Sequence, residues 1–84
     1  MGMKDERGRK RMKIAVIDDE RSARNELIYQ ILHTMPESEI SEADSGSSAL
    51  ALMSENDFDI LFVDIGLNDM EGTTLAAAAR KLLP

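Results

Sequence analysis

Three aspartates follow the two most apolar segments of this sequence. Asp18 and Asp19 come directly after residues 14–17, and Asp64 comes directly after residues 60–63. If these segments are adjacent parallel strands, their carboxyl ends meet at one edge of the sheet, where ligands bind in such sheets. Carboxylates held close together repel one another, and a divalent cation removes that repulsion. Because Mg²⁺ prefers oxygen ligands, the pattern predicts a magnesium site.

The same acids also allow a simpler interpretation. Asp and Glu are common just before helices, where they cap the first turn and interact favourably with the helix dipole. Taken alone, Asp18 and Asp19 favour this capping role. The presence of Asp64 after a second apolar segment favours the metal site instead.

The segments around the acids are typical of strands that alternate with helices. Residues 14–17 form an apolar run bounded by charge, which indicates a buried parallel strand. From about residue 22 to residue 34, apolar residues recur at helical spacing, with Ser22 as the expected N-cap and Pro36 as the stop. The predicted buried stripe of this helix comprises Ala23, Leu27, Ile28, Ile31, Leu32 and Met35.

The rest of the chain repeats this alternation. The expected elements are a short strand at residues 39–43, a short helix, a strand within residues 58–65, a loop at residues 66–72 and a last helix. Ser47 is the expected N-cap of the short helix, and Thr73 or Thr74 that of the last one. The order predicts an α/β fold in which three parallel strands alternate with three helices.

Length, charge and residue usage limit the classes of function. The 84 residues allow one small domain, and 43% hydrophobic against 31% charged residues is an ordinary globular balance. The net charge is −6, yet residues 1–11 are basic, so we expect a flexible basic tail followed by an acidic domain at residues 12–84. Such a domain repels nucleic acid and anionic membranes. With no cysteine, signal segment or long apolar run, we expect a cytoplasmic protein.

Three stretches of the sequence together resemble a known family. They are KIAVIDDE, ALALMSENDFDILFVDI and LNDMEG. From about Met12 to the end, the chain resembles a response-regulator receiver domain of two-component signalling. The resemblance implies a partial flavodoxin-like fold made of the first three strand–helix units. It also implies a sensor histidine kinase or a phosphotransfer protein as partner.

The resemblance implies a role for each residue of the acidic site. Asp64 would accept the phosphoryl group, Asp19 would bind Mg²⁺ directly, and Asp18 would act nearby through water. The backbone carbonyl of Gly66 would be another Mg²⁺ ligand, and Gly72 would allow a tight turn into the third helix. Phosphoryl transfer depends on positioning and charge neutralisation, which a metal beside a nucleophilic carboxylate provides. Such a domain would at most phosphorylate itself from a donor and would not be a turnover enzyme.

Receiver domains normally continue with two further strands and helices, which supply a Ser or Thr and a Lys to the phosphate. The sequence has no counterpart of these segments, so we expect a truncated receiver with impaired phosphoryl acceptance. The alternative is a non-catalytic half-receiver that associates with itself or with a partner. Residues 60–63 would then form an open apolar edge without Lys or Pro, which favours a homo-oligomer through the third strand.

Two further interpretations are weaker. Phosphatases that use Mg²⁺ and an Asp nucleophile usually have Asp-x-Asp after the first strand, whereas this sequence has Glu20 in the second of these positions. His33 is the only histidine and suggests a phosphoryl carrier, but a cation near a helix C-terminus is more typical of a surface residue.

Overall fold

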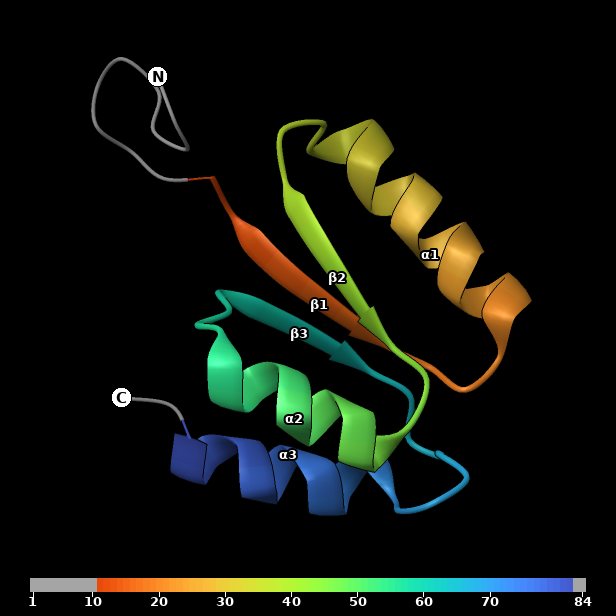
Figure 1. Cartoon of the computed structure of the whole chain (residues 1–84). Coiled ribbons are helices and arrows are strands. Elements are labelled where there is room, and N and C mark those ends of the chain that lie inside the picture. Colours follow the sequence, from red (N-terminus) through yellow and green to blue (C-terminus); the bar gives the residue numbers. More distant parts are fainter. Residues whose placement is uncertain (1–10, 83–84) are drawn as a thin grey trace.

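Parallel strands and helices alternate along residues 11–82, the part of the chain that the computed structural model describes (Figure 1). The elements are β1 (Lys13–Ile17), α1 (Arg21–Thr34), β2 (Glu39–Ala43), α2 (Gly46–Glu55), β3 (Ile60–Val63) and α3 (Gly72–Leu82). The sheet is parallel with strand order β2-β1-β3, which confirms the predicted arrangement. The tail predicted at residues 1–11 lies outside the described residues, apart from Arg11. None of the three helices is long and apolar enough to cross a membrane.

The central strand β1 is the most buried element, because it lies between two strands and helices cover both faces of the sheet (Figure 1). Successive side chains of a strand point to opposite faces. Ile14 and Val16 pack with Ile31 of α1 on one face. Ala15 and Ile17 pack with residues of α2 and α3 on the other. This burial explains why the first strand is a continuous apolar run.

Helix α1 buries a narrower stripe than the sequence predicted. The residues that pack against the sheet are Leu27, Ile28, Ile31 and Met35. Ala23 is exposed and Leu32 is 38% exposed, so their assignment to the core was wrong, because they flank the side that faces the sheet. The helix begins at Arg21 with Glu20 at the N-cap and no side-chain cap. The predicted cap, Ser22, is therefore an ordinary helical residue.

The other two helices also start earlier than predicted. The N-cap of α2 is Ser45, whose side chain accepts a backbone hydrogen bond from the first turn. Ser47 lies inside the helix and donates its hydroxyl elsewhere. Helix α3 begins at Gly72, so Thr73 and Thr74 are inside its first turn and cap nothing. A hydroxyl residue does cap α2, but it is Ser45 rather than Ser47, and Asp69 from a distant loop bonds to the same turn.

Candidate metal centre

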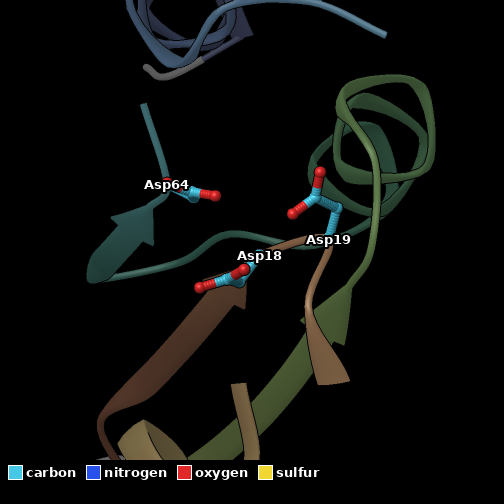
Figure 2. A group of neighbouring side chains, drawn as sticks. All are labelled: Asp18, Asp19 and Asp64. Atoms are coloured by element: carbon cyan, nitrogen blue, oxygen red, sulfur yellow. The ribbon is translucent and has the colours of Figure 1, made fainter. Parts of the chain in front are cut away.

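The carboxylates of Asp18 and Asp64 are neighbours because the strands that precede them are paired in register. Ile17 of β1 is opposite Val63 of β3, and the Asp64 N–H donates to the Ile17 carbonyl at 2.9 Å. Asp19 is the next residue of the β1–α1 loop. Its carboxylate turns towards the other two, so the three side chains border one space at the carboxyl ends of the strands (Figure 2). The structure thus brings together the three aspartates that the sequence singled out.

The separation of the carboxylates suits a small cation. One oxygen from each lies within 4.8 Å of the others, and all three side chains are half-buried. Two oxygens bound to one Mg²⁺ at about 2.1 Å are at most about 4.2 Å apart. Small side-chain rotations, or a water between one carboxylate and the ion, would bridge the difference between 4.8 Å and about 4.2 Å. The geometry therefore fits Mg²⁺ without movement of the strands.

Two local hydrogen bonds orient these carboxylates. The Glu20 N–H donates to Asp18 Oδ1 at 2.9 Å, and the Gly66 N–H donates to Asp64 Oδ1 at 3.4 Å. Each bond comes from the backbone two residues later, as in an Asx turn. The bond to Asp64 is long and therefore weak. Because an ionised carboxylate has two acceptor oxygens, Asp64 keeps capacity for a metal ion and for a reacting group.

Arg24 supports the turn that carries Asp18 and Asp19, and the sequence analysis missed this residue. Its guanidinium donates from Nη1 to the Asp18 carbonyl at 2.8 Å and from Nε to Glu42 at 2.8 Å. The side chain is 13% exposed. The contact fixes the turn that carries Asp18 and Asp19. A signal was present in the sequence, since Arg24 is the one cation among the apolar positions of this helix face, but its partners lie on other elements.

The two glycines of the predicted site differ in their surroundings. Gly66 lies in the β3–α3 loop, opposite Glu71 in a single β-bridge, and a Cβ there would meet nothing within 4 Å. Its role as a carbonyl ligand of Mg²⁺ stays a prediction. Gly72 is buried, and a Cβ there would lie 2.5 Å from the Asp64 carbonyl oxygen and 2.9 Å from Ile65 Cα. Gly72 thus lets the start of α3 approach the backbone of Asp64.

His33 lies at the opposite end of α1 from the aspartates. It is exposed and stacks on Tyr29 with a ring separation of 6.2 Å and an interplanar angle of 19°. The β1–α1 loop with Asp18 and Asp19 precedes the first turn of this helix, whereas His33 occupies its last turn. The structure therefore keeps His33 apart from the candidate metal centre.

A second residue that the sequence analysis missed is Asp69. It lies in the β3–α3 loop, and its carboxylate accepts hydrogen bonds from Gly46 and Ser47 at the start of α2. These hydrogen bonds, with those from the backbone N–H groups of Gly46 and Ser47 contributing most, hold the pKa of Asp69 below its ordinary value of 3.8. No local sequence signal marks Asp69, because the amides that it caps are more than twenty residues earlier.

Comparison with known proteins agrees with this geometry. The family model of the response regulator receiver domain matches residues 14–83. The chain belongs to the receiver domain family. Among solved receiver domains, it resembles one from Methylobacillus flagellatus (28% identity, TM-score 0.75) and one from Methanospirillum hungatei JF-1 (33% identity, TM-score 0.74). These matches cover 89% and 87% of this chain, and 61% and 57% of those chains.

Curated relatives of this receiver domain are longer regulatory proteins. It is 39% identical over 71 residues to the transcriptional regulatory protein LytR of Staphylococcus aureus (strain N315). It is 35% identical over 71 residues to the sensory transduction protein LytT of Bacillus subtilis (strain 168). Each match covers 84% of this chain, but only 29% and 30% of the relatives. The chain thus corresponds to less than a third of their length.

Proposed function

We propose that this receiver domain accepts a phosphoryl group on Asp64 with the help of Mg²⁺. The observation that carries the proposal is that Asp18, Asp19 and Asp64 each bring a carboxylate oxygen within 4.8 Å of the others. They do so at the carboxyl ends of paired parallel strands, the usual position of a ligand site in such a sheet. Membership of the receiver family supports the assignment.

The donor set suits Mg²⁺ in its chemistry as well as in its spacing. Asp19 and Asp64 would hold the ion directly, Asp18 would hold it through water, and the Gly66 carbonyl would add a neutral oxygen. Carboxylates, a carbonyl and retained waters are the shell that Mg²⁺ prefers. When bound, the ion supplies positive charge to the carboxylates and to the incoming phosphoryl oxygens.

Asp64 would act as the nucleophile. One of its oxygens forms a bond to phosphorus while the bond between phosphorus and the donor breaks, which gives an aspartyl phosphate and a free donor. The weak hydrogen bond from Gly66 orients Asp64 Oδ1, and Asp18 and Asp19 would hold Mg²⁺, which would supply positive charge beside the reacting group. Arg24 keeps the turn that carries Asp18 in place.

The donor that we propose is a phosphohistidine on a sensor histidine kinase or a phosphotransfer protein. This assignment rests on the receiver family, whose members take part in two-component signalling. The net charge of −6 is unsuited to nucleic acid as a direct partner of this segment and favours a basic or cation-bearing surface. A small acyl phosphate can replace the protein donor in a test.

The direct experiment is incubation with acetyl phosphate, with and without Mg²⁺, followed by intact-mass spectrometry. We expect one added phosphoryl group that depends on Mg²⁺ and is absent from Asp64→Asn. Asp57→Asn is the matched control, because it makes the same change at an exposed position before β3, away from its carboxyl end. Labelling of Asp64→Asn at the wild-type level would contradict the proposal.

We also propose that the 84-residue chain associates with itself through β3, and the pairing of this strand supports the proposal. Within residues 11–82, β3 pairs only with β1, and its four residues are half-buried and apolar. An open strand edge without Lys or Pro readily pairs with another strand. A second copy of this chain would supply that strand.

Light scattering after size exclusion tests the association at micromolar concentration. We expect a dimer or larger assembly. Val63→Lys should weaken it more than Val63→Ala does, because only lysine places a charge at the edge while both variants lose the apolar side chain. A compact monomer, or equal association of the two variants, would rule the β3 edge out.

A further inference from the structure

Backbone contacts join the two ends of the β3–α3 loop, residues 64–71, beside the candidate metal centre. Gly66 and Glu71 form a bridge across it, and the Gly72 N–H donates to the Ile65 carbonyl at 2.6 Å. Between these points, Leu67 is only 8% exposed and belongs to the core beneath α2 and α3. The loop is therefore a packed unit rather than a loose connection, and Gly66 is part of it.

The same loop caps a helix that is distant in sequence. Asp69 Oδ1 accepts a hydrogen bond from the Gly46 N–H at 2.7 Å. Asp69 Oδ2 accepts from the Ser47 N–H and from the Ser47 hydroxyl, both at 2.9 Å. The first backbone N–H groups of a helix have no partner within the helix. Asp69 thus provides for two of them in α2, and we call these three bonds the Asp69 clamp.

Packing reinforces the clamp. The side chain of Met70 lies directly on Gly46, where an added Cβ would overlap it. Met70 also packs against the core formed by α2, α3 and one face of the sheet. The loop and the first turn of α2 are thus in direct contact through both hydrogen bonds and side-chain packing, so displacement of one requires displacement of the other.

We infer that Asp69 is a positioning residue that couples the candidate metal centre to the first turn of α2. The inference rests on the proposed function, because Gly66, three residues before Asp69, is the loop's proposed contact with Mg²⁺. Movement of the Gly66 carbonyl towards an ion would move the whole β3–α3 loop, because backbone contacts join its two ends. The Asp69 clamp would pass this movement to the first turn of α2. The start of α2 therefore responds to the state of the carboxylate site, and the clamp in turn holds the Gly66 carbonyl in place for binding.

The coupling can be measured on the full chain, labelled with ¹⁵N, during a Mg²⁺ titration by NMR. In the wild type, the amide signals of Gly46 and Ser47 should shift with the same midpoint as those of Asp19 and Asp64. In Asp69→Ala, the shifts at Gly46 and Ser47 should be lost while those at the aspartates remain. Mg²⁺ affinity should fall by up to about tenfold, the lower end of the effect seen when partners of metal ligands are removed.

Two further variants test whether the effect of Asp69→Ala comes from the lost hydrogen bonds, from the lost negative charge or from impaired folding. Glu71→Gln removes one negative charge from the same loop at an exposed side chain, so it should weaken Mg²⁺ binding slightly and keep the coupling. Asp69→Asn keeps one acceptor oxygen of the two, so it should restore part of the response at Gly46 or Ser47. It also keeps the test valid if Asp69→Ala does not fold.

The outcomes distinguish this inference from the proposed function. Wild-type binding of Mg²⁺ without a response at Gly46 and Ser47 would overturn the inference and leave the metal site intact. An equal response in wild type and Asp69→Asn, or in wild type and Asp69→Ala, would also overturn it. Absence of any Mg²⁺ shift at Asp19 and Asp64 would contradict the proposed function and this inference together.

Discussion

Replacement of Gly72 by alanine should destabilise the domain and disturb Asp64. The added Cβ would lie 2.5 Å from the Asp64 carbonyl oxygen and 2.9 Å from Ile65 Cα. Both are backbone atoms of the segment that leaves β3, so no side-chain rotation can make room. The start of α3 must move away from Asp64 by several tenths of an ångström, against the core contacts of the buried Leu75.

The expected loss follows from two opposing effects. Overpacking in a tight site costs about 1–3 kcal/mol. Alanine is favoured over glycine by about 1 kcal/mol inside a helix, but Gly72 is the first residue of α3, so the gain there is smaller. The net effect is a loss of about 1–2 kcal/mol in the free energy of unfolding. For a domain of this size, each kcal/mol lowers the melting temperature by roughly 4–8 °C.

Urea unfolding followed by circular dichroism measures this loss, since small domains usually unfold in one cooperative step. Gly66→Ala, in the loop that precedes α3, is the matched control, because a Cβ there would meet nothing within 4 Å. Its free energy of unfolding should stay within about 0.5 kcal/mol of wild type. Equal unfolding midpoints for Gly72→Ala and Gly66→Ala would refute the argument from close approach.

Three further predictions concern contacts around the site. Arg24→Gln should lower the free energy of unfolding in urea by about 1–2 kcal/mol, since it removes the hydrogen bonds to Glu42 and to the Asp18 carbonyl. The bond to Glu42 contributes less than a buried one, because the Glu42 side chain is 48% exposed. No change in either stability or Mg²⁺ affinity would count against the supporting role of Arg24. Ser45→Ala should cost about 1 kcal/mol through loss of the α2 cap, and an unchanged melting temperature would show that the clamp alone suffices. The lowered pKa of Asp69 means that its contribution to stability is present above pH 3.8 and is lost as the pH falls below that value. The free energy of unfolding of Asp69→Asn should therefore fall less steeply with decreasing pH in this range than that of the wild type. Equal pH dependence of the two proteins would contradict the stabilising role of the Asp69 carboxylate.

Features with a local signal were predictable from the sequence. Residues 14–17 and 60–63 are apolar runs because β1 is covered on both faces and β3 packs against both cores. The acids that follow them mark the strand ends, so the meeting of Asp18, Asp19 and Asp64 could be expected once the strands were taken as neighbours. The alternation of strands and helices along the chain and the family resemblance together predicted the fold.

Features that depend on contacts between distant segments were not predictable. The start of α2 is satisfied by Asp69 as well as by Ser45, and no local pattern links residues that far apart. The role of Arg24 was missed because its partners, Glu42 and the Asp18 carbonyl, lie outside its own helix. Gly72 was expected to serve a tight turn, whereas the structure shows that its missing Cβ makes room for the backbone of Asp64.

The most direct test of the account is a calorimetric Mg²⁺ titration of three proteins side by side. The wild type and Asp57→Asn should bind one ion with equal affinity, because Asp57 is exposed and precedes β3. Asp64→Asn should bind at least about tenfold more weakly, since it loses one of the two carboxylates proposed to hold the ion directly. Equal Mg²⁺ binding by the wild type and Asp64→Asn would contradict the claim that these carboxylates form the metal centre.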